Sequence, residues 1–281
     1  MIARVALLVF TLMLGGCTGL IFQPMRQHAL VPAEVGVEAR DEWFTAADGT
    51  RLHAWFLPAR GTARGTVLFL HGNAENISTH LASVYWMPAY GYQVLLFDYR
   101  GYGYSEGKPS LPGIHQDFAA ALEYVRTLPE VDPTRIVVFG QSMGGATAIT
   151  GLAHSPARAS VRALVVEGAP TSYRSLAREL LSNSWLTWLF QWPLSLTISD
   201  DYRPIDAVDG ISPVPLLVVH SRDDEVIPSH HGVALHAAAR EPRELWLVDG
   251  ARHIAAFTTR ERRERLVAWL DARLSADAQA P

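Results

Sequence analysis

Short apolar runs alternate with helical patterns along most of this chain, and this alternation constrains the fold more than any other feature. The apolar runs lie at residues 51–57, 66–70, 92–97, 135–139, 162–166, 216–220 and 244–248. Segments with helical spacing lie at residues 76–89, 114–128, 143–154, 229–240 and 258–276. Strand-like runs that alternate with helices indicate βαβ units and an α/β fold with a mostly parallel sheet covered on both faces.

A sheet of this kind binds ligands in the crevice beyond the carboxyl ends of its strands, so chemically active side chains are expected just after the apolar runs. The 281 residues are 49% hydrophobic and 19% charged, which suits one large globular domain rather than a disordered chain. The net charge of −4 gives no basic footprint for a nucleic acid. We therefore expect no nucleic-acid partner.

The N-terminus has the pattern of a secretory signal. Arg4 precedes an apolar run at residues 5–14, too short for a membrane span, which needs about 20 residues. The run ends in Leu-Gly-Gly-Cys at Cys17, the only cysteine. This ending resembles a bacterial lipoprotein box, in which the peptide is cut before the cysteine and the cysteine is acylated. The alternative is an uncleaved signal anchor in which Cys17 is incidental.

The lipoprotein resemblance divides the chain into a signal peptide (1–16), a tether and lead-in (17–40) and one large globular domain (41–281). Two or three acyl chains on Cys17 would hold the protein stably on a membrane. By the same resemblance, Thr18 after the cysteine favours the outer membrane of the bacterial cell envelope.

A serine follows the apolar run at residues 135–139 in the sequence Gly140-Gln141-Ser142-Met143-Gly144. A sharp turn from strand to helix exposes a nucleophilic serine, and the residues two before and two after it must be small for the turn to close. Gly140 and Gly144 fill both places, so we predict that Ser142 is a nucleophile. A serine in a plain turn is the alternative.

A second candidate element follows the run at residues 66–70, in the sequence His71-Gly72-Asn73-Ala74. An acyl-transfer oxyanion needs two preorganised N–H donors. One is expected from Met143, directly after the nucleophile, and Asn73 is our candidate for the other. We expect His71 to hold this loop, the alternative being a metal ligand or a base.

The remaining partners of Ser142 are expected after the last two apolar runs. Asp223, Asp224 and Glu225 stand in a row after residues 216–220. His253 lies in a Gly-x-x-His loop after residues 244–248, where a base is expected. His230, His231 and His236 are interpreted as surface helix residues, because no carboxylate or thiolate ligand cluster accompanies them in the sequence. No metal site and no cofactor are expected.

The order of nucleophile, acid and histidine resembles the α/β-hydrolase superfamily over about residues 42–274, most closely its His-Gly-Asn-Ala subgroup of serine-aminopeptidase-like enzymes. The resemblance implies an α/β-hydrolase fold with a catalytic triad of Ser142, Asp224 and His253, Asp223 being the alternative acid. The family's Asp-x-Arg-Gly-x-Gly-x-Ser stretch matches residues 98–105. Ser221 departs from the family's usual glycine in the turn before the acid.

Residues 171–200 break the alternation and are too long for a simple crossover. Their tryptophans and leucines form an apolar stripe at helical spacing. We expect a short helical lid whose substrate-binding residues include Trp185, Trp188 and Leu189, the alternative being an ordinary helix packed on the core.

These features predict a serine hydrolase that cleaves esters or thioesters with an apolar acyl group through an acyl-enzyme. An amidase or peptidase with the same triad is the nearest alternative. A non-catalytic envelope lipoprotein that binds an apolar ligand is the alternative from another class. The oligomeric state is not predicted.

The lipoprotein interpretation is tested by Cys17→Ser. We expect the wild-type protein to partition with membranes and to carry the added mass of acyl chains on Cys17. The variant should lose both properties. A variant that still partitions with membranes, with no difference in mass beyond the exchanged residue, would contradict the interpretation.

Overall fold

The computed structural model describes residues 22–182 and 187–275. Their centre is an eight-stranded sheet in the order β10-β9-β8-β7-β4-β6-β3-β2. The strands are β10 (Arg243–Val248), β9 (Leu216–Ser221), β8 (Val161–Glu167), β7 (Ile136–Gln141), β4 (Gly65–Leu70), β6 (Tyr92–Phe97), β3 (Arg51–Leu57) and β2 (Arg40–Thr45). All neighbouring pairs from β10 to β6 are parallel, and β3 runs antiparallel to both of its neighbours.

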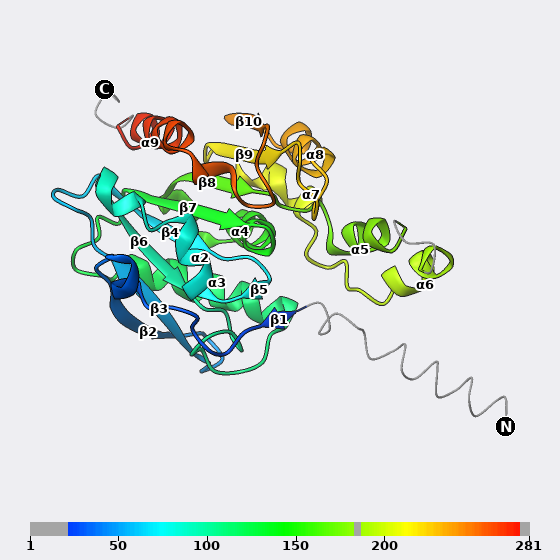
Figure 1. The fold of residues 1–281 in the computed structure, drawn as a ribbon, viewed down its shortest axis with the longest axis horizontal. Helices are drawn as coiled ribbons and strands as arrows, with labels where there is room; N and C mark the ends of the chain where they lie inside the picture. Colours follow the sequence, from blue (N-terminus) through cyan, green and yellow to red (C-terminus); the bar gives the residue numbers. More distant parts are fainter. Residues whose placement is uncertain (1–21, 183–186, 276–281) are drawn as a thin grey trace.

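Helices cover both faces of this sheet (Figure 1). One face packs against α3 (Leu111–Val125), α4 (Met143–Ala153) and α8 (His230–Ala238). The other packs against α2 (Ile77–His80) and α9 (Arg260–Leu274). Successive side chains of a strand point to opposite faces, so both faces of the central strands are buried. The order and direction of the strands confirm the predicted α/β fold with a mostly parallel sheet.

Two local elements differ from the sequence prediction. Residues 76–89 form α2 and two short 3₁₀ turns, η3 (Leu81–Ser83) and η4 (Met87–Tyr90), rather than one helix. Val84 leaves the helical conformation, with φ −130°, and Pro88 has no N–H to continue a helical ladder. Strand β2 was also not predicted, because its buried positions are too few to stand out.

The lid is formed by α5 (Tyr173–Ser182), η6 (Trp188–Phe190) and α6 (Gln191–Ser195). Figure 1 shows α5 and α6 extending beyond the sheet, away from the helices that cover its faces. No residue of α5 is fully buried. The chain returns to the body through α7 (Pro204–Ala207).

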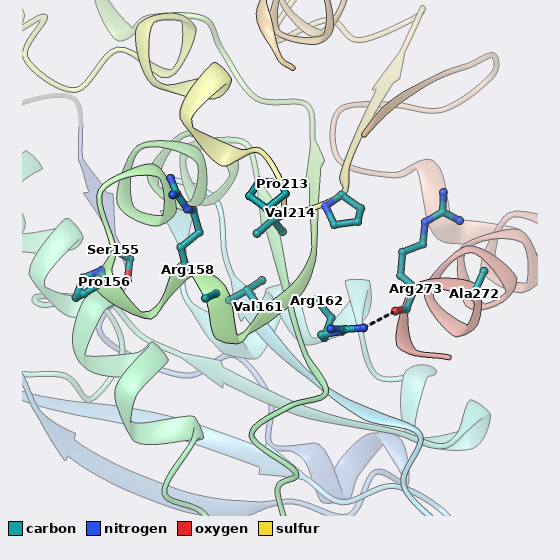
Figure 2. A pocket seen from close by; sticks show the side chains of 11 residues that line it. Ser155, Pro156, Arg158, Val161, Arg162, Pro213, Val214, Ala272 and Arg273 are labelled. Atoms are coloured by element: carbon teal, nitrogen blue, oxygen red, sulfur yellow. Dashed lines mark hydrogen bonds between the residues drawn. The ribbon is translucent and has the colours of Figure 1, made fainter. Parts of the chain in front are cut away.

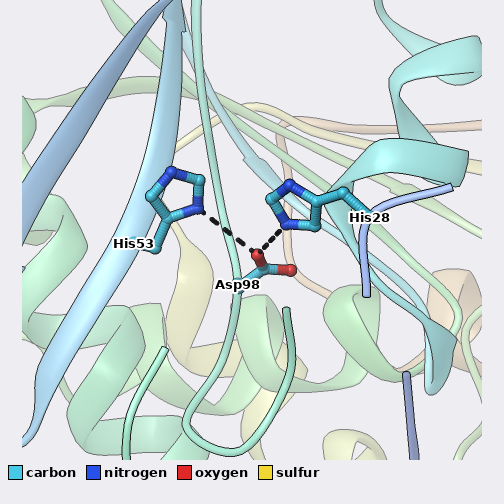
Figure 3. A group of neighbouring side chains, drawn as sticks. All are labelled: His28, His53 and Asp98. Atoms are coloured by element: carbon cyan, nitrogen blue, oxygen red, sulfur yellow. Dashed lines mark hydrogen bonds and ion pairs between the residues drawn. The ribbon is translucent and has the colours of Figure 1, made fainter. Parts of the chain in front are cut away.

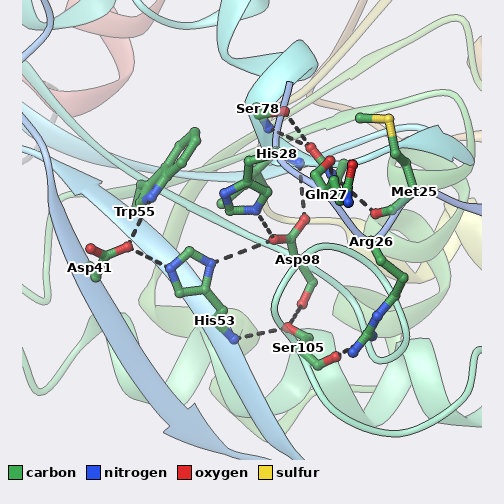
Figure 4. A network of polar contacts seen from close by, with 12 residues as sticks. Met25, Arg26, Gln27, His28, Asp41, His53, Trp55, Ser78, Asp98 and Ser105 are labelled. Carbon is green, nitrogen blue, oxygen red and sulfur yellow. Dashed lines mark hydrogen bonds and ion pairs between the residues drawn. The ribbon is translucent and has the colours of Figure 1, made fainter. Parts of the chain in front are cut away.

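The described part of the lead-in packs on the body and is hydrogen-bonded to it. Strand β1 (Gln23–Pro24) pairs with β5 (Ala74–Glu75). The side-chain amide of Asn76 donates to the carbonyls of Met25 (3.1 Å) and Gln27 (2.7 Å), and the amide of Ala29 donates to Ser78 Oγ at 2.8 Å (Figure 4). Backbone groups between residues 23 and 29 are therefore hydrogen-bonded to residues 74–78 of the body.

A buried carboxylate fixes the end of this lead-in. Figure 3 shows His28 and His53 pointing toward one oxygen of Asp98, at 3.0 and 3.6 Å. Burial by itself would raise the pKa of Asp98, but contacts with His28 and His53 outweigh it and lower the pKa to about 2. An ionised Asp98 thus ties the lead-in to β3 and β6.

In the part of the chain that is described, no helix combines the length and the apolar character required to cross a membrane.

Candidate active site

A strained turn presents Ser142 at the end of β7. Ser142 has φ 52° and ψ −117° and is followed at once by α4. A Cβ on Gly144 would lie 2.2 Å from the carbonyl oxygen of Leu70, and one on Gly140 would lie 2.4 Å from that of Gly144. Both positions therefore require glycine, as the motif predicts, because the helix starts in contact with the neighbouring strands.

His253 and Asp224 form a hydrogen-bonded pair beside this turn. His253 Nδ1 lies 2.7 Å from Asp224 Oδ2, and the other carboxylate oxygen accepts the amides of Val226 (2.9 Å) and Ile227 (2.8 Å). Burial would raise the pKa of Asp224, but hydrogen bonds from His220, His253 and the Ile227 amide overcome it and hold the pKa below its usual range. The ionised carboxylate therefore fixes the orientation of the imidazole through Nδ1.

The neighbouring acids have other partners. Asp223 accepts the backbone amide of Gly250 at 2.6 Å, and Glu225 pairs with Arg252 at 2.8 Å. Of the three acids in the row, Asp224 is the one hydrogen-bonded to His253.

One cavity of about 550 Å³ brings the predicted residues together. Ser142, Met143, Asn73 and His253 all line it, although they follow three different strands. Met143 is the first residue of α4, so its amide belongs to a helix N-terminus, which favours negative charge. The Asn73 side chain accepts from the Tyr102 hydroxyl at 2.9 Å, which fixes its loop.

His71 does not line this cavity. It is fully buried, and its Nδ1–H donates to the Gly72 carbonyl at 2.6 Å. Burial, with help from nearby His80, lowers the pKa of His71 to about 3, so it is neutral at ordinary pH. Its contacts are those of a residue that holds the loop.

The lid contributes a wall of the cavity, but not through the residues that were predicted. The wall consists of Tyr173, Leu176, Ala177 and Leu180 of α5 together with Ile198. Trp188 and Leu189 are instead 56% and 72% exposed and do not line the cavity. This corrects the prediction for these two residues, since an apolar stripe does not reveal which surface it faces. Trp185 lies outside the described residues, as does Cys17.

The interpretation of the α8 histidines as surface residues is confirmed for His230, which is exposed, and corrected for His231. His231 is 1% exposed, and its Nδ1 accepts the amide of Thr171 at 3.1 Å. Its other nitrogen and that of His230 both lie 3.3 Å from Glu179 Oε2. A carboxylate from α5, distant in sequence, thus joins these histidines and latches the lid helix to α8.

Two groups in the described residues gather enough ligand-type side chains to hold a metal ion: His28, His53 and Asp98, and Glu179, His230 and His231. Hydrogen bonds and ion pairs link the members of each group to one another.

A second cavity, of about 710 Å³, lies beside the amino ends of β8 and β9, whereas Ser142 follows the carboxyl end of β7 (Figure 2). Arginines 158, 162 and 273 line it. Arg158 donates to the Gly210 carbonyl and Arg273 pairs with Glu244, so both already have partners. Neither a serine hydroxyl on a strained turn nor a histidine accompanies them among the lining residues.

Glu167 is a part of the site that the sequence analysis missed. It is 2% exposed at the end of β8, where burial raises the pKa of its carboxyl. Its oxygens accept the Gln141 side-chain amide (2.7 Å) and the Ala256 backbone amide (2.7 Å). Glu167 therefore joins the residue before the nucleophile to the loop that carries His253. An acid that ends an apolar strand run was the available signal.

Comparisons with known proteins agree with this geometry. A family model described as "Serine aminopeptidase, S33" matches residues 61–203, just over half of the chain. The protein YfhR of Escherichia coli K12 is 36% identical over 221 residues, covering 77% of this chain and 74% of YfhR. The chain belongs to the serine aminopeptidase family. The Arabidopsis thaliana "Alpha/beta hydrolase domain-containing protein WAV2" is 35% identical over 78% of this chain and 73% of its own.

Solved structures support the fold of this family member. The esterase Pf2001 of Pyrococcus furiosus superposes with a TM-score of 0.69 at 24% identity, covering 91% of this chain and 97% of that one. Acetyl xylan esterase 1 from Thermoanaerobacterium gives 0.64 at 19% identity and covers 84% of each chain. The protein is a hydrolase with the α/β-hydrolase fold.

An exchange of two side chains tests the role of Glu167. In Glu167→Gln the new NH₂ group faces either the side-chain amide of Gln141 or the backbone amide of Ala256, and two donors cannot bond to each other. We therefore expect the free energy of unfolding to fall by about 1–3 kcal/mol. We expect kcat/KM to fall with it. In the double variant with Gln141→Glu, the NH₂ group at position 167 donates to the carboxylate at position 141, and the remaining oxygen at position 167 accepts the Ala256 amide. The double variant should therefore recover most of the lost stability and most of the lost kcat/KM. Urea denaturation and hydrolysis of a soluble ester measure the two effects. A neutral single variant, or an exchange that recovers nothing, would contradict this role.

Proposed function

We propose that this family member is a serine hydrolase that cleaves carboxylic ester or thioester bonds of substrates with an apolar acyl group. The observation that carries the proposal is the 2.7 Å contact between His253 and Asp224 beside a serine on a strained turn, in one cavity with an apolar wall. The esterases among the structural neighbours favour the same chemistry.

The proposed reaction proceeds in two halves. His253 Nε2 takes the proton of the Ser142 hydroxyl while its oxygen attacks the carbonyl carbon, and the Asn73 and Met143 amides stabilise the oxyanion. The bond to the alcohol or thiol then breaks, and His253 gives that leaving group its proton. Water repeats the sequence on the acyl-enzyme, releases the carboxylic acid and restores Ser142.

An amide or peptide substrate is the alternative within the same machinery, and the family's name favours it. Against it, the lid side of the cavity is formed mainly by aliphatic side chains such as Leu176 and Ile198, while Glu75 places one carboxylate at the opposite loop of the cavity. The other alternative is a non-catalytic ligand-binding lipoprotein of the envelope. It gives no reason for a serine in a strained conformation beside a paired imidazole.

For the location, we propose a lipid anchor at Cys17 that holds the protein in the bacterial cell envelope, on the outer membrane. The proposal rests on the lipoprotein-like sequence that ends at Cys17 and on Thr18 after it.

Labelling with a fluorophosphonate tests the nucleophile. We expect wild type to gain one phosphonyl group on Ser142, and Ser142→Ala to gain none and to lose about 10⁴-fold or more in kcat. Ser160→Ala, a serine outside the cavity, is the matched control and should label normally. An unlabelled wild type would support the non-catalytic alternative.

Matched panels of p-nitrophenyl esters and p-nitroanilides then separate esterase from amidase. With esters, kcat/KM should rise about fourfold for each added methylene, from about 0.8 kcal/mol per buried CH₂, until the cavity is full. A wild type that labels but cleaves only anilides would replace the ester proposal with the amidase alternative.

A further inference from the structure

The lid carries an apolar ridge that no other described element covers. We call "the ridge" the exposed large apolar residues of the lid and of the residue that follows it: Leu180, Trp188, Leu189, Trp192, Leu194 and Leu196. Their side chains are 42–72% exposed, and they lie in a segment that Figure 1 shows extending away from the sheet. Exposed apolar groups gathered in this way mark an interaction surface rather than ordinary surface composition.

The ridge is continuous with the candidate active site. Leu180 belongs to the ridge and also lines the cavity that contains Ser142. The guanidinium of Arg178 lies 4.6 Å from the centre of the Trp192 ring, a cation over an aromatic face. Aromatic and arginine side chains with an apolar body and a polar end are typical of the boundary between lipid and water.

The N-terminal end of the described chain lies at the same cavity. Gln23 lines it, and the Gln23 amide lies 3.3 Å from Asn73 Oδ1. The contacts of Asn76, Ser78 and Asp98 with residues 25–29 fix this segment (Figure 4). The chain that leads back to the membrane-anchor candidate therefore leaves the body at a fixed point beside the active site.

The length of chain before this point is short. Cys17 and Phe22 are five positions apart, which spans at most about 18 Å even when fully extended. An acylated Cys17 would thus hold the mouth of the cavity within about 18 Å of a bilayer surface, on the side of the molecule where the ridge lies.

We propose that the ridge docks on a lipid bilayer, so that the cavity opens onto the membrane and takes acyl esters of membrane lipids as substrates. This inference rests on the proposed hydrolase function and names its substrate class. The short lead-in keeps the ridge close to the bilayer, and burial of the ridge side chains in the lipid boundary supplies the binding energy. The acyl chain of the lipid then passes along Leu180 and Leu176 toward Ser142.

Docking is measured with a fluorescent probe on the full-length protein in vesicles of phosphatidylethanolamine and phosphatidylglycerol. With Cys17 acylated, Leu189→Cys provides one reactive thiol for an environment-sensitive dye. We expect its emission to shift to the blue and to be quenched by lipids carrying a nitroxide. The same dye at Val35→Cys, which is 46% exposed on the 3₁₀ turn η2 (Pro32–Val35), is the control and should show neither change.

Activity separates docking from chemistry. The double variant Leu189→Ser/Leu196→Ser removes ridge residues that do not line the cavity. We expect it to hydrolyse p-nitrophenyl butyrate in solution as wild type does, but to lose about tenfold or more on an acyl ester embedded in the vesicles. Val35→Ser/Val233→Ser, which removes exposed apolar residues elsewhere, should keep both activities.

Three results would overturn the docking proposal while leaving the hydrolase proposal intact. They are a probe at position 189 that reports water, a double variant that retains full activity on vesicles, and a double variant whose main effect is to dissociate a dimer, which would make a second copy the partner of the ridge. A wild type without activity on the soluble ester would instead contradict the proposed function itself.

Discussion

The site depends on the contact between the start of α4 and the strands beside it. Ser142 has a positive φ, and the helix that follows it begins against β4, where the carbonyl of Leu70 leaves no room for a side chain at position 144. This contact exposes the hydroxyl and aligns the amides at the helix start in one step. The cost in backbone strain is about 1–3 kcal/mol, which the buried strands around it must outweigh.

Three buried carboxylates arrange the chemistry around this turn, each with a different set of donors. Asp224 is ionised and holds His253, Glu167 joins the loop of His253 to Gln141, and Asp98 fastens the lead-in at His28. A buried carboxylate is tolerated only where donors surround it, so each of these groups fixes several chain segments at once. The lid is joined to α8 by the latch between Glu179 and His231, and Tyr173 at the start of α5 packs against the core.

Two kinds of feature could be predicted from the sequence: the alternating strands and helices, and the positions where the backbone accepts only one residue type. The buried parallel strands appear as continuous apolar runs, and the turn at Ser142 needs glycine at two fixed positions. The partners of Glu167 and of Glu179 lie in segments distant in sequence, so a local pattern can mark the acid but not the residue that it binds. The apolar stripe within residues 171–200 predicted a helical lid, but whether Trp188 and Leu189 face the cavity or the surroundings depends on how α5 and α6 pack.

The most direct test of the central claim is a crystal structure of the protein after reaction with a fluorophosphonate. The account predicts a phosphorus atom bonded to Ser142 Oγ, its free oxygen within hydrogen-bond distance of the Asn73 and Met143 amides, and His253 Nε2 within reach of Ser142 Oγ. An adduct on another residue would contradict the account. So would an imidazole turned away from Ser142, with the phosphonyl oxygen in contact with neither amide.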